Sequence, residues 1–379
     1  MKRIIMRAAA VLLAITAVFA YNVNESRAAV DISAKSAILI EAESGRVLYE
    51  QNAFEKMPMA STTKIMTAIV ALENSGLGEI VEVGPNASGV EGSSIWLSVG
   101  EKITLSDMLF GLMLASGNDA AIAIAEHVGG SLEKFVEMMN SKAKEIGAYN
   151  THFCNPNGLP VDNHYTTAYD LALISAHAMK NEFFREVVKT EYKEIPWQGH
   201  EWNRVVKNKN KILWQYQGGN GIKTGFTKDA GKCLSAAAER DGLQLISVVL
   251  CAPDMFRDCM ELMDYGFDNY SNRLIQQAGE HIGDVTVTRG VEENFSVYTR
   301  EDVYYPLTDE EFESLVKRVY IEKEIDAPVT EGQKIGSIDI WLGSNQIYSL
   351  ALTADKDIGE NSYKYNLDKV LGRWLRLVT

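Results

Sequence analysis

The sequence predicts a mixed α/β domain, built of an antiparallel sheet and a cluster of helices, followed by a small all-β domain. Strand-like segments open and close residues 30–275, and apolar helical segments lie between them. Beyond residue 280 the chain consists of short strands between turns. A length of 379 residues suits two domains. We place the first domain at residues 30–275 and the β-domain at 280–362.

The first domain is expected to begin with a β-hairpin and to end with a meander. The hairpin consists of strands 36–40 and 47–49 around the turn 43–46. The meander comprises three strands, 222–227, 233–239 and 243–250. Its Asp241-Gly242 turn, set between apolar runs, is a strong hairpin signal. We expect the two ends of the domain to share one sheet.

Helices are predicted for the middle of this domain. A polar start at Ser61 and a stop at Gly76 delimit an apolar helix through Leu72. Thr104 and Ser131 are predicted to cap two later helices. The helical segments after the first are 104–115, 120–128, 131–147 and 169–179. The sequence therefore predicts a helical cluster between the two ends of the sheet.

Composition excludes several classes of function. The formal net charge of -14 argues against a nucleic-acid partner, because phosphate binding needs a basic surface. The chain has 6 histidines and 4 cysteines, but it contains neither a His-Glu-x-x-His motif nor a Cys-x-x-Cys pair. We therefore expect no metal and no cofactor.

The two ends of the chain carry their own signals. Residues 1–29 have basic residues before an apolar run from Ala8 to Ala20, which is the pattern of a secretory signal peptide. The run is short for a membrane span, although an uncleaved anchor is an alternative. Residues 364–379 form a basic amphipathic segment with Trp374, which can lie in a membrane interface or pack on the β-domain. We expect an extracytoplasmic protein, with this tail as a candidate contact to the outer face of the cytoplasmic membrane.

Three short motifs stand in order along the first domain. They are Ser61-Thr62-Thr63-Lys64, Ser116-Gly117-Asn118 and Lys223-Thr224-Gly225. The first supplies a nucleophile and a base, the second supplies polar groups for proton relay, and the third supplies a strand that can bind a peptide. Each of the last two motifs occurs once, although alone the second would indicate a turn and the third a bulged strand. Together they indicate serine acyl transfer without histidine or metal.

The pattern Ser-x-x-Lys is weak by itself. It occurs at Ser61, Ser131, Ser141 and Ser314. Among these, Ser61 opens an apolar helix, so Lys64 must be buried there and must share a helix face with Ser61. Burial, and repulsion from Lys223, would lower the pKa of Lys64 until its neutral amine can take the serine proton. The start of the helix would also offer N–H groups to an oxyanion.

This ordered set of motifs is similar to the signature of penicillin-binding proteins and serine β-lactamases. Within that group the chain resembles the low-molecular-weight D-alanyl-D-alanine carboxypeptidases. The closer match lies in residues 59–67, 108–120 and 221–225. The resemblance covers nearly the whole mature chain, because these enzymes also have a C-terminal β-domain and often an amphipathic C-terminal helix. It implies a serine DD-peptidase/β-lactamase-like fold for the first domain.

The resemblance also implies an activity and the residues that perform it. The enzyme would remove the terminal D-alanine of peptidoglycan stem peptides, and β-lactam antibiotics such as penicillins would inhibit it. Ser61 would attack the carbonyl between the two terminal D-alanines, with Lys64 as base. Ser116 would pass the proton toward the leaving amine. Asn118 and Lys223 would position the substrate and Lys64.

Further substrate contacts follow from the same resemblance. The backbone N–H groups of Ser61 and Phe226 would form the oxyanion hole. Thr224, next to Gly225 in the third motif, would bind the terminal carboxylate of the substrate. In the family an arginine downstream assists, and Arg257 is the candidate by its position.

Other functions also fit parts of the sequence. A class A β-lactamase shares the three motifs, but it needs a glutamate that no segment clearly supplies, and it leaves the β-domain unexplained. A non-catalytic penicillin-binding sensor or wall-binding protein would keep the fold without turnover. A peptidase that also cuts cross-links is equally compatible with the motifs.

Overall fold

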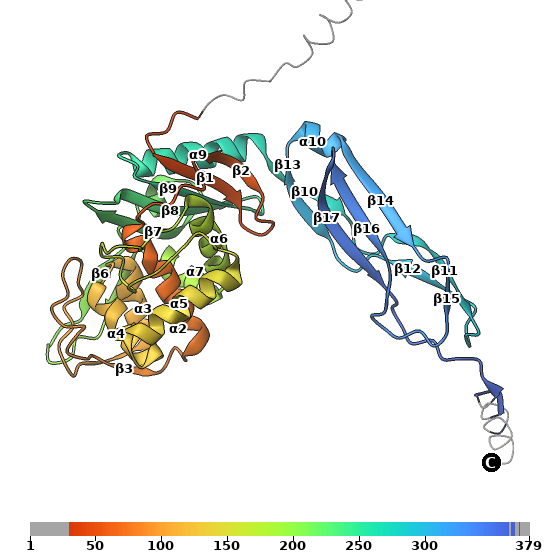
Figure 1. Ribbon diagram of the computed structural model, residues 1–379, viewed down its shortest axis with the longest axis horizontal. Coiled ribbons are helices and arrows are strands. Elements are labelled where there is room, and N and C mark those ends of the chain that lie inside the picture. The colour runs from red at the N-terminus through yellow and green to blue at the C-terminus, as the bar shows by residue number, and fades with distance from the viewer. Residues whose placement is uncertain (1–29, 364, 368–370, 372–379) are drawn as a thin grey trace, which may run out of the picture.

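Residues 30–363, 365–367 and 371 are described by a computed structural model (Figure 1). The first domain contains a five-stranded antiparallel sheet in the order β2-β1-β9-β8-β7. Its strands are β1 (Ser36–Glu41), β2 (Val47–Gln51), β7 (Gly219–Thr227), β8 (Gly231–Arg240) and β9 (Leu243–Leu250). The predicted hairpin and meander are confirmed. Because β1 pairs with β9, the two ends of the domain share the sheet.

Both faces of this sheet are buried. Successive side chains of a strand point to opposite faces. In β1, Ile38 and Ile40 therefore pack with the helical cluster, while Ala37 and Leu39 pack on the other side with α9 (Met255–Asn269). Figure 1 shows α9 over one face of the sheet and the cluster on the other. β7 is one of the two edge strands, so it can pair with an extended chain.

Five helices of the cluster match the predicted segments, whereas the sixth, at residues 182–189, was not predicted. Local signals explain where several of them begin and end. The helices are α2 (Lys64–Asn74), α3 (Leu105–Leu114), α4 (Asn118–Gly129), α5 (Leu132–Ile146), α6 (Ala168–Met179) and α7 (Glu182–Lys189). Thr104 caps α3 by accepting from the N–H of Asp107 at 3.1 Å. Ser131 caps α5, and Gly147 ends it with a φ of 92°.

Short elements outside the predictions surround the cluster. They are the 3₁₀ helix η1 (Ala60–Thr63), the hairpin of β3 (Ile80–Glu82) and β4 (Lys102–Thr104), the hairpin of β5 (Tyr192–Ile195) and β6 (Arg204–Lys207), and α8 (Ile212–Gln215). None of them is longer than four residues. A segment this short carries too little periodicity to be recognised from sequence.

The second domain is mostly β-structure, as predicted. Its elements are β10 (Ser271–Gln276), β11 (His281–Thr288), β12 (Asn294–Tyr298), β13 (Val303–Leu307), α10 (Asp309–Glu313), β14 (Leu315–Ile321), β15 (Glu324–Asp326), β16 (Lys334–Leu342) and β17 (Asn345–Thr353). The sheets run β10-β13, β12-β11-β15 and β14-β16-β17. They enclose one hydrophobic core, to which Val285 and Ile338 belong. β10 contributes Ile275 to this core, so the β-structure begins a few residues before 280.

Arg46, in the turn between β1 and β2, connects the two domains. Its guanidinium lies 2.5 Å from the carboxylate of Glu311 and also donates to Pro306 O. The same group lies over the rings of Tyr270 and Tyr305, at 5.2 and 5.5 Å from their centroids.

The predicted signal peptide, residues 1–29, lies outside the described residues, and so does most of the tail at 364–379. Among the helices that are described, none combines the length and the apolar character that crossing a bilayer requires.

Candidate active site

Ser61 lies in η1, which leads directly into α2. We expected an α-helix that begins at Ser61, so this first turn is tighter than predicted. Thr62 and Thr63 each donate a hydroxyl hydrogen bond to the carbonyl three residues earlier, at 2.6 and 2.8 Å. Hydroxyl groups that bond to nearby carbonyls in this way compete with α-helical pairing. Ser61 itself is partly exposed.

Lys64 is fully buried, and its side-chain nitrogen contacts three oxygen atoms. Nζ lies 3.1 Å from Ser61 Oγ, 2.6 Å from Asn118 Oδ1 and 2.5 Å from Asn157 O. A neutral amine has two N–H donors and one lone pair. The two donors suit the amide oxygens of Asn118 and Asn157, which accept only. The lone pair is then left for the hydroxyl hydrogen of Ser61.

The electrostatic surroundings favour this neutral form. Burial lowers the pKa of Lys64 well below its ordinary value, and the positive charges of Lys223 and Lys209 lower it further. The negative charge of Asp119 opposes them more weakly. Lys64 is therefore suited to act as a base within hydrogen-bond distance of a serine hydroxyl.

The second motif is tied to Lys64 through Asn118. Asn118 begins α4, and its Nδ2 donates to Glu91 O at 2.6 Å while its Oδ1 accepts from Lys64. Ser116 is buried in the turn before it and has a φ of 64°. A left-handed residue of this kind lets the chain turn sharply from α3 into α4.

The third motif lies on β7, next to η1. Lys223 is 1% exposed, and burial, aided by the charge of Lys209, lowers its pKa to about 7. A Cβ atom added to Gly225 would lie 3.0 Å from Ser61 N, so the glycine lets the strand approach the serine. Thr224 is partly exposed. Phe226 is exposed on the same edge strand.

Asn157 was not predicted as a site residue, although its backbone oxygen is one of the three oxygen atoms in contact with Lys64 Nζ. It lies in the loop 155–160, whose turn-forming residues are visible in the sequence. Gly158 follows with a φ of 85°, and a Cβ there would lie 2.0 Å from Ala60 O. The loop and η1 are thus packed backbone against backbone.

His164 also contacts η1, through a hydrogen bond to the side chain of Thr63. Its Nδ1 accepts from the N–H of Cys154 at 3.0 Å, so its Nε2 carries the hydrogen and donates to Thr63 Oγ1 at 2.8 Å. Burial and the neighbouring His152 lower the pKa of His164 to about 4. The imidazole is therefore neutral at physiological pH. Its role is structural, because it links the backbone at Cys154 to the Thr63 hydroxyl.

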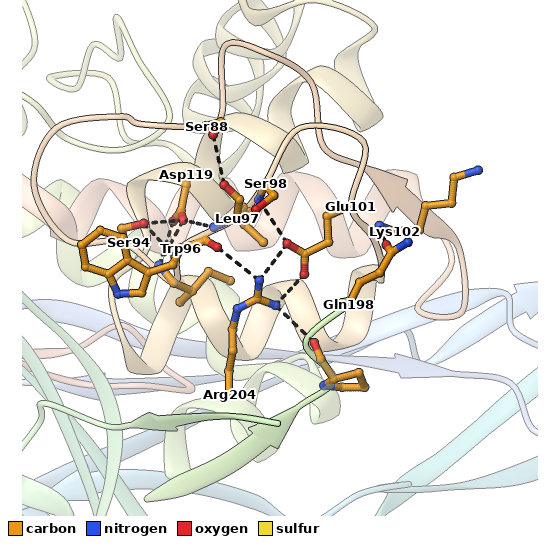
Figure 2. A network of polar contacts seen from close by, with 12 residues as sticks. Ser88, Ser94, Trp96, Leu97, Ser98, Glu101, Lys102, Asp119, Gln198 and Arg204 are labelled. Atoms are coloured by element: carbon orange, nitrogen blue, oxygen red, sulfur yellow. Dashed lines mark hydrogen bonds and ion pairs between the residues drawn. The ribbon is translucent and has the colours of Figure 1, made fainter. Parts of the chain in front are cut away.

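A polar network holds the loop 84–101 against the second motif (Figure 2). Asp119, next to Asn118, accepts hydrogen bonds from the backbone N–H groups of Ile95 and Leu97 at 3.0 and 3.1 Å. Its carboxylate also accepts from the hydroxyl of Ser94 at 2.6 Å. The loop is therefore anchored one residue away from a ligand of Lys64.

The end of this loop is fixed by a buried ion pair between Glu101 and Arg204 of β6. Glu101 Oε1 and Arg204 Nη1 are 2.6 Å apart, and both side chains are less than 5% exposed. Figure 2 shows the guanidinium reaching from β6 toward the loop, where it also donates to Trp96 O at 3.2 Å. The charged pair links the β5–β6 hairpin to the loop.

We predict that Arg204→Met lowers the free energy of unfolding by about 3–5 kcal/mol, because it leaves the Glu101 carboxylate buried without its partner. The double variant Glu101→Leu with Arg204→Met should recover most of the loss. Urea denaturation of the three proteins measures both effects. A double variant as unstable as Arg204→Met would contradict this explanation.

Arg257 lies on α9, away from the contacts described above. Its side chain is half exposed, and its guanidinium is 3.4 Å from Glu261 and 3.8 Å from Asp258, both on the same helix. Within the described residues its ion pairs are confined to these two carboxylates. Its role in substrate binding stays a prediction.

Comparison with known proteins gives a consistent result. The family model described as D-alanyl-D-alanine carboxypeptidase matches residues 22–254, and the model of the penicillin-binding protein 5 C-terminal domain matches residues 270–360. The chain is 32% identical to the D-alanyl-D-alanine carboxypeptidase DacF of Bacillus subtilis over 352 residues, which is 90% of each protein.

Solved structures agree with this match. Penicillin-binding protein 5 of Haemophilus influenzae has a TM-score of 0.74 at 28% identity, covering 87% of this chain and 98% of its own. A peptidoglycan synthesis regulatory factor (PBP3) of Streptococcus pneumoniae has a TM-score of 0.73 at 28% identity, covering 86% and 100%. The ordered motifs, the buried lysine beside the serine and the matching second domain lead to one conclusion: the chain belongs to the D-alanyl-D-alanine carboxypeptidase family of penicillin-binding proteins.

Proposed function

We propose that this chain is a serine D-Ala-D-Ala carboxypeptidase, which removes the terminal D-alanine of peptidoglycan stem peptides through an acyl-enzyme on Ser61. Penicillins acylate the same serine. The observation that carries the proposal is the 3.1 Å contact between Lys64 Nζ and Ser61 Oγ. Burying a lysine is costly, so one held neutral beside a serine hydroxyl is best explained by catalysis.

The reaction proceeds in two halves. In acylation, Lys64 takes the Ser61 proton while Oγ attacks the carbonyl between the two D-alanines. The N–H groups of Ser61 and Phe226 stabilise the oxyanion. The C–N bond then breaks, and Ser116 delivers the proton from Lys64 to the leaving amine, which departs as D-alanine.

In deacylation, water attacks the ester carbonyl and loses a proton to Lys64. The ester bond breaks, Ser61 regains its proton, and the shortened peptide leaves. Asn118 and Asn157 keep the Lys64 amine in place in both halves, because its two N–H groups stay bonded to them. Lys223 positions the substrate, Thr224 binds its terminal carboxylate, and the β7 edge pairs with the peptide.

The matched β-domain favours a peptidase over a β-lactamase, since the three motifs alone are common to both. A binding protein without turnover would not need Lys64 neutral, because binding a peptide requires no base. Cleavage of cross-links by the same site is a side activity that the motifs allow.

We also propose that the chain is exported and works outside the cytoplasmic membrane. Two arguments support export. Residues 1–29 have the basic and apolar pattern of a signal peptide, and the proposed substrate lies in the cell wall. The amphipathic tail at 364–379 is the proposed contact with the membrane surface.

The test is to expose the purified protein to a labelled penicillin and to locate the adduct by peptide mass spectrometry. We expect one adduct, on the peptide that contains Ser61, and none on the Ser61→Ala variant. The same variant should release no D-alanine from a peptide ending in D-Ala-D-Ala. An adduct elsewhere, or none, would overturn the proposal, and rapid penicillin hydrolysis would favour a β-lactamase.

A further inference from the structure

Four aromatic side chains stand on two loops of the first domain, and the reaction uses none of them. Trp96 belongs to the loop 84–101, and Trp197, His200 and Trp202 belong to the loop of the β5–β6 hairpin. We call these four residues the aromatic rim. Trp96 and Trp202 are 73% and 62% exposed. Large apolar rings left in water at one place on a protein indicate a surface that contacts something else.

Arg204 and Lys102 hold the two loops together. The Arg204 guanidinium donates to Trp96 O at 3.2 Å and lies 4.8 Å from the centroid of the Trp197 ring. The backbone N–H of Lys102, just after the first loop, donates to Gln198 Oε1 at 2.8 Å. The aromatic rim is therefore one local surface, although its two loops are far apart in the chain.

Within the hairpin loop the rings form a row. The centroids of Trp197 and His200 are 4.1 Å apart, and those of His200 and Trp202 are 5.4 Å apart. Trp197 lies at the inner end of this row, next to Arg204, and Trp202 lies at its exposed end. Stacking of this kind fixes the ring positions before any ligand binds.

Trp96 is held outward by the structure of its own loop. Its neighbours Ile95 and Leu97 are buried, and both donate their backbone N–H to Asp119. The N–H of Trp96 donates to Ser94 Oγ at 2.8 Å. Trp96 has a φ of 63°, a left-handed conformation that is unfavourable for a bulky residue. Strain of this kind persists where the surroundings fix it, and it is concentrated at functional sites.

The aromatic rim is connected to the active site through the loop 84–101. Asn118, whose Oδ1 contacts Lys64, donates from its Nδ2 to Glu91 O at 2.6 Å and from its backbone N to Ser93 O at 2.7 Å. One loop thus positions a ligand of the catalytic lysine and carries Trp96. A polymer that presents its peptide to Ser61 passes close to this loop.

The composition of the aromatic rim suits a sugar chain. A pyranose ring has an apolar face of C–H groups that stacks on an indole, and its edge carries groups that form hydrogen bonds. Exposed polar side chains, those of Gln198, Glu201 and Asn203, lie between the rings along the hairpin loop.

Other partners fit this composition less well. A membrane surface attracts lysine and arginine, and residues 196–203 contain neither. The core of a protein interface is a contiguous apolar patch, whereas polar residues separate the rings here.

We propose that the aromatic rim is a second binding site, which holds the sugar backbone of the cell-wall polymer. This inference rests on the proposed function, because the peptides that the enzyme trims are attached to a backbone of amino sugars. Trp96 and Trp202 each stack on a sugar ring. Binding at this site keeps the enzyme on the wall and raises the effective concentration of stem peptides at Ser61.

The test measures the affinity of the purified protein for peptide-free glycan strands, prepared from cell walls with an amidase. Isothermal titration calorimetry gives the Kd. We expect Trp96→Ala and Trp202→Ala each to weaken binding by about tenfold, the range of one aromatic stacking contact. Trp202→Tyr should keep most of the affinity, because an aromatic face remains. The double variant should lose about 100-fold if the two contacts are independent.

Tyr149→Ala is the matched control. Tyr149 is 77% exposed and lies in the turn after α5, outside both loops of the aromatic rim. Its removal takes away an equally exposed aromatic ring and should leave the affinity for glycan unchanged.

D-alanine release from a soluble peptide ending in D-Ala-D-Ala is measured in parallel, so that the possible failures are distinguishable. A wild type that releases no D-alanine would overturn the proposed function. An active wild type that does not bind glycan, or tryptophan variants that bind it as the wild type does, would overturn this inference alone. Loss of binding to vesicles of anionic phospholipid in the tryptophan variants, with glycan binding retained, would also overturn it and would assign the aromatic rim to a membrane. An equal loss of glycan binding and of D-alanine release would contradict a separate site.

Discussion

Lys64→Met is expected to reduce the rate of Ser61 acylation by about 10³- to 10⁴-fold, at the upper end of general-base catalysis. Methionine has nearly the length of lysine and is apolar, so it fills the buried site but cannot take the serine proton. The measurements are D-alanine release and the rate of penicillin adduct formation, with Ser61→Ala as the baseline. A loss of less than tenfold would show that another group acts as the base.

The pH dependence of stability provides an independent check on Lys64. The folded protein holds this lysine at a lowered pKa, whereas the unfolded chain keeps its proton up to about pH 10.4. In the window between these values the unfolded state binds more protons, so the free energy of unfolding rises with pH. The wild type should therefore gain stability relative to Lys64→Met as the pH rises through this window toward about 10.4. A difference that does not change with pH would mean that Lys64 is charged in the folded protein.

Gly158→Ala is expected to inactivate the enzyme and to lower the free energy of unfolding by about 3–4 kcal/mol. Its Cβ would lie 2.0 Å from Ala60 O and 3.0 Å from Ser61 N, and both are backbone atoms that no rotamer change can move away. Either the loop or η1 must shift. A shift of the loop takes Asn157 O away from Lys64, and a shift of η1 moves the serine. We expect acylation to fall at least about 100-fold.

Gly147→Ala is the control for this substitution. Gly147 also has a positive φ, of 92°, but an added Cβ meets nothing within 4 Å. Gly147→Ala should lower the free energy of unfolding only by the backbone strain, about 1–2 kcal/mol, and should leave the rate of acylation unchanged. Urea denaturation and penicillin labelling measure both variants. Equal effects at the two glycines would mean that strain, and not the contact with η1, explains the result.

The strong sequence signals were those that depend on neighbours in the chain. The apolar runs of β1, β8 and β9 next to turn residues, and the caps Thr104 and Ser131, act over a few residues, and the structure contains the elements they predict. The burial of Lys64 was also predictable, because no other charged residue stands in the apolar segment that it opens.

Contacts between distant segments were not predictable in the same way. Asn157 acts through its backbone oxygen, which every residue has, so its side chain carries no signal for that role. Glu101 and Arg204 are 103 positions apart, and singly each looks like an ordinary surface charge. The 3₁₀ turn at Ser61 depends on hydroxyl bonds whose geometry no spacing reveals.

The sequence by itself determined the order of the motifs, the nucleophile and its base, and the class of chemistry, because these depend on residue type and local spacing. Only the tertiary structure decided which atoms surround Lys64, that the charge of Lys209 acts on it, and that β7 can approach η1 at Gly225. The physical reason is that a pKa and a hydrogen-bond partner are properties of the assembled surroundings. Those surroundings form only when segments far apart in the chain pack together.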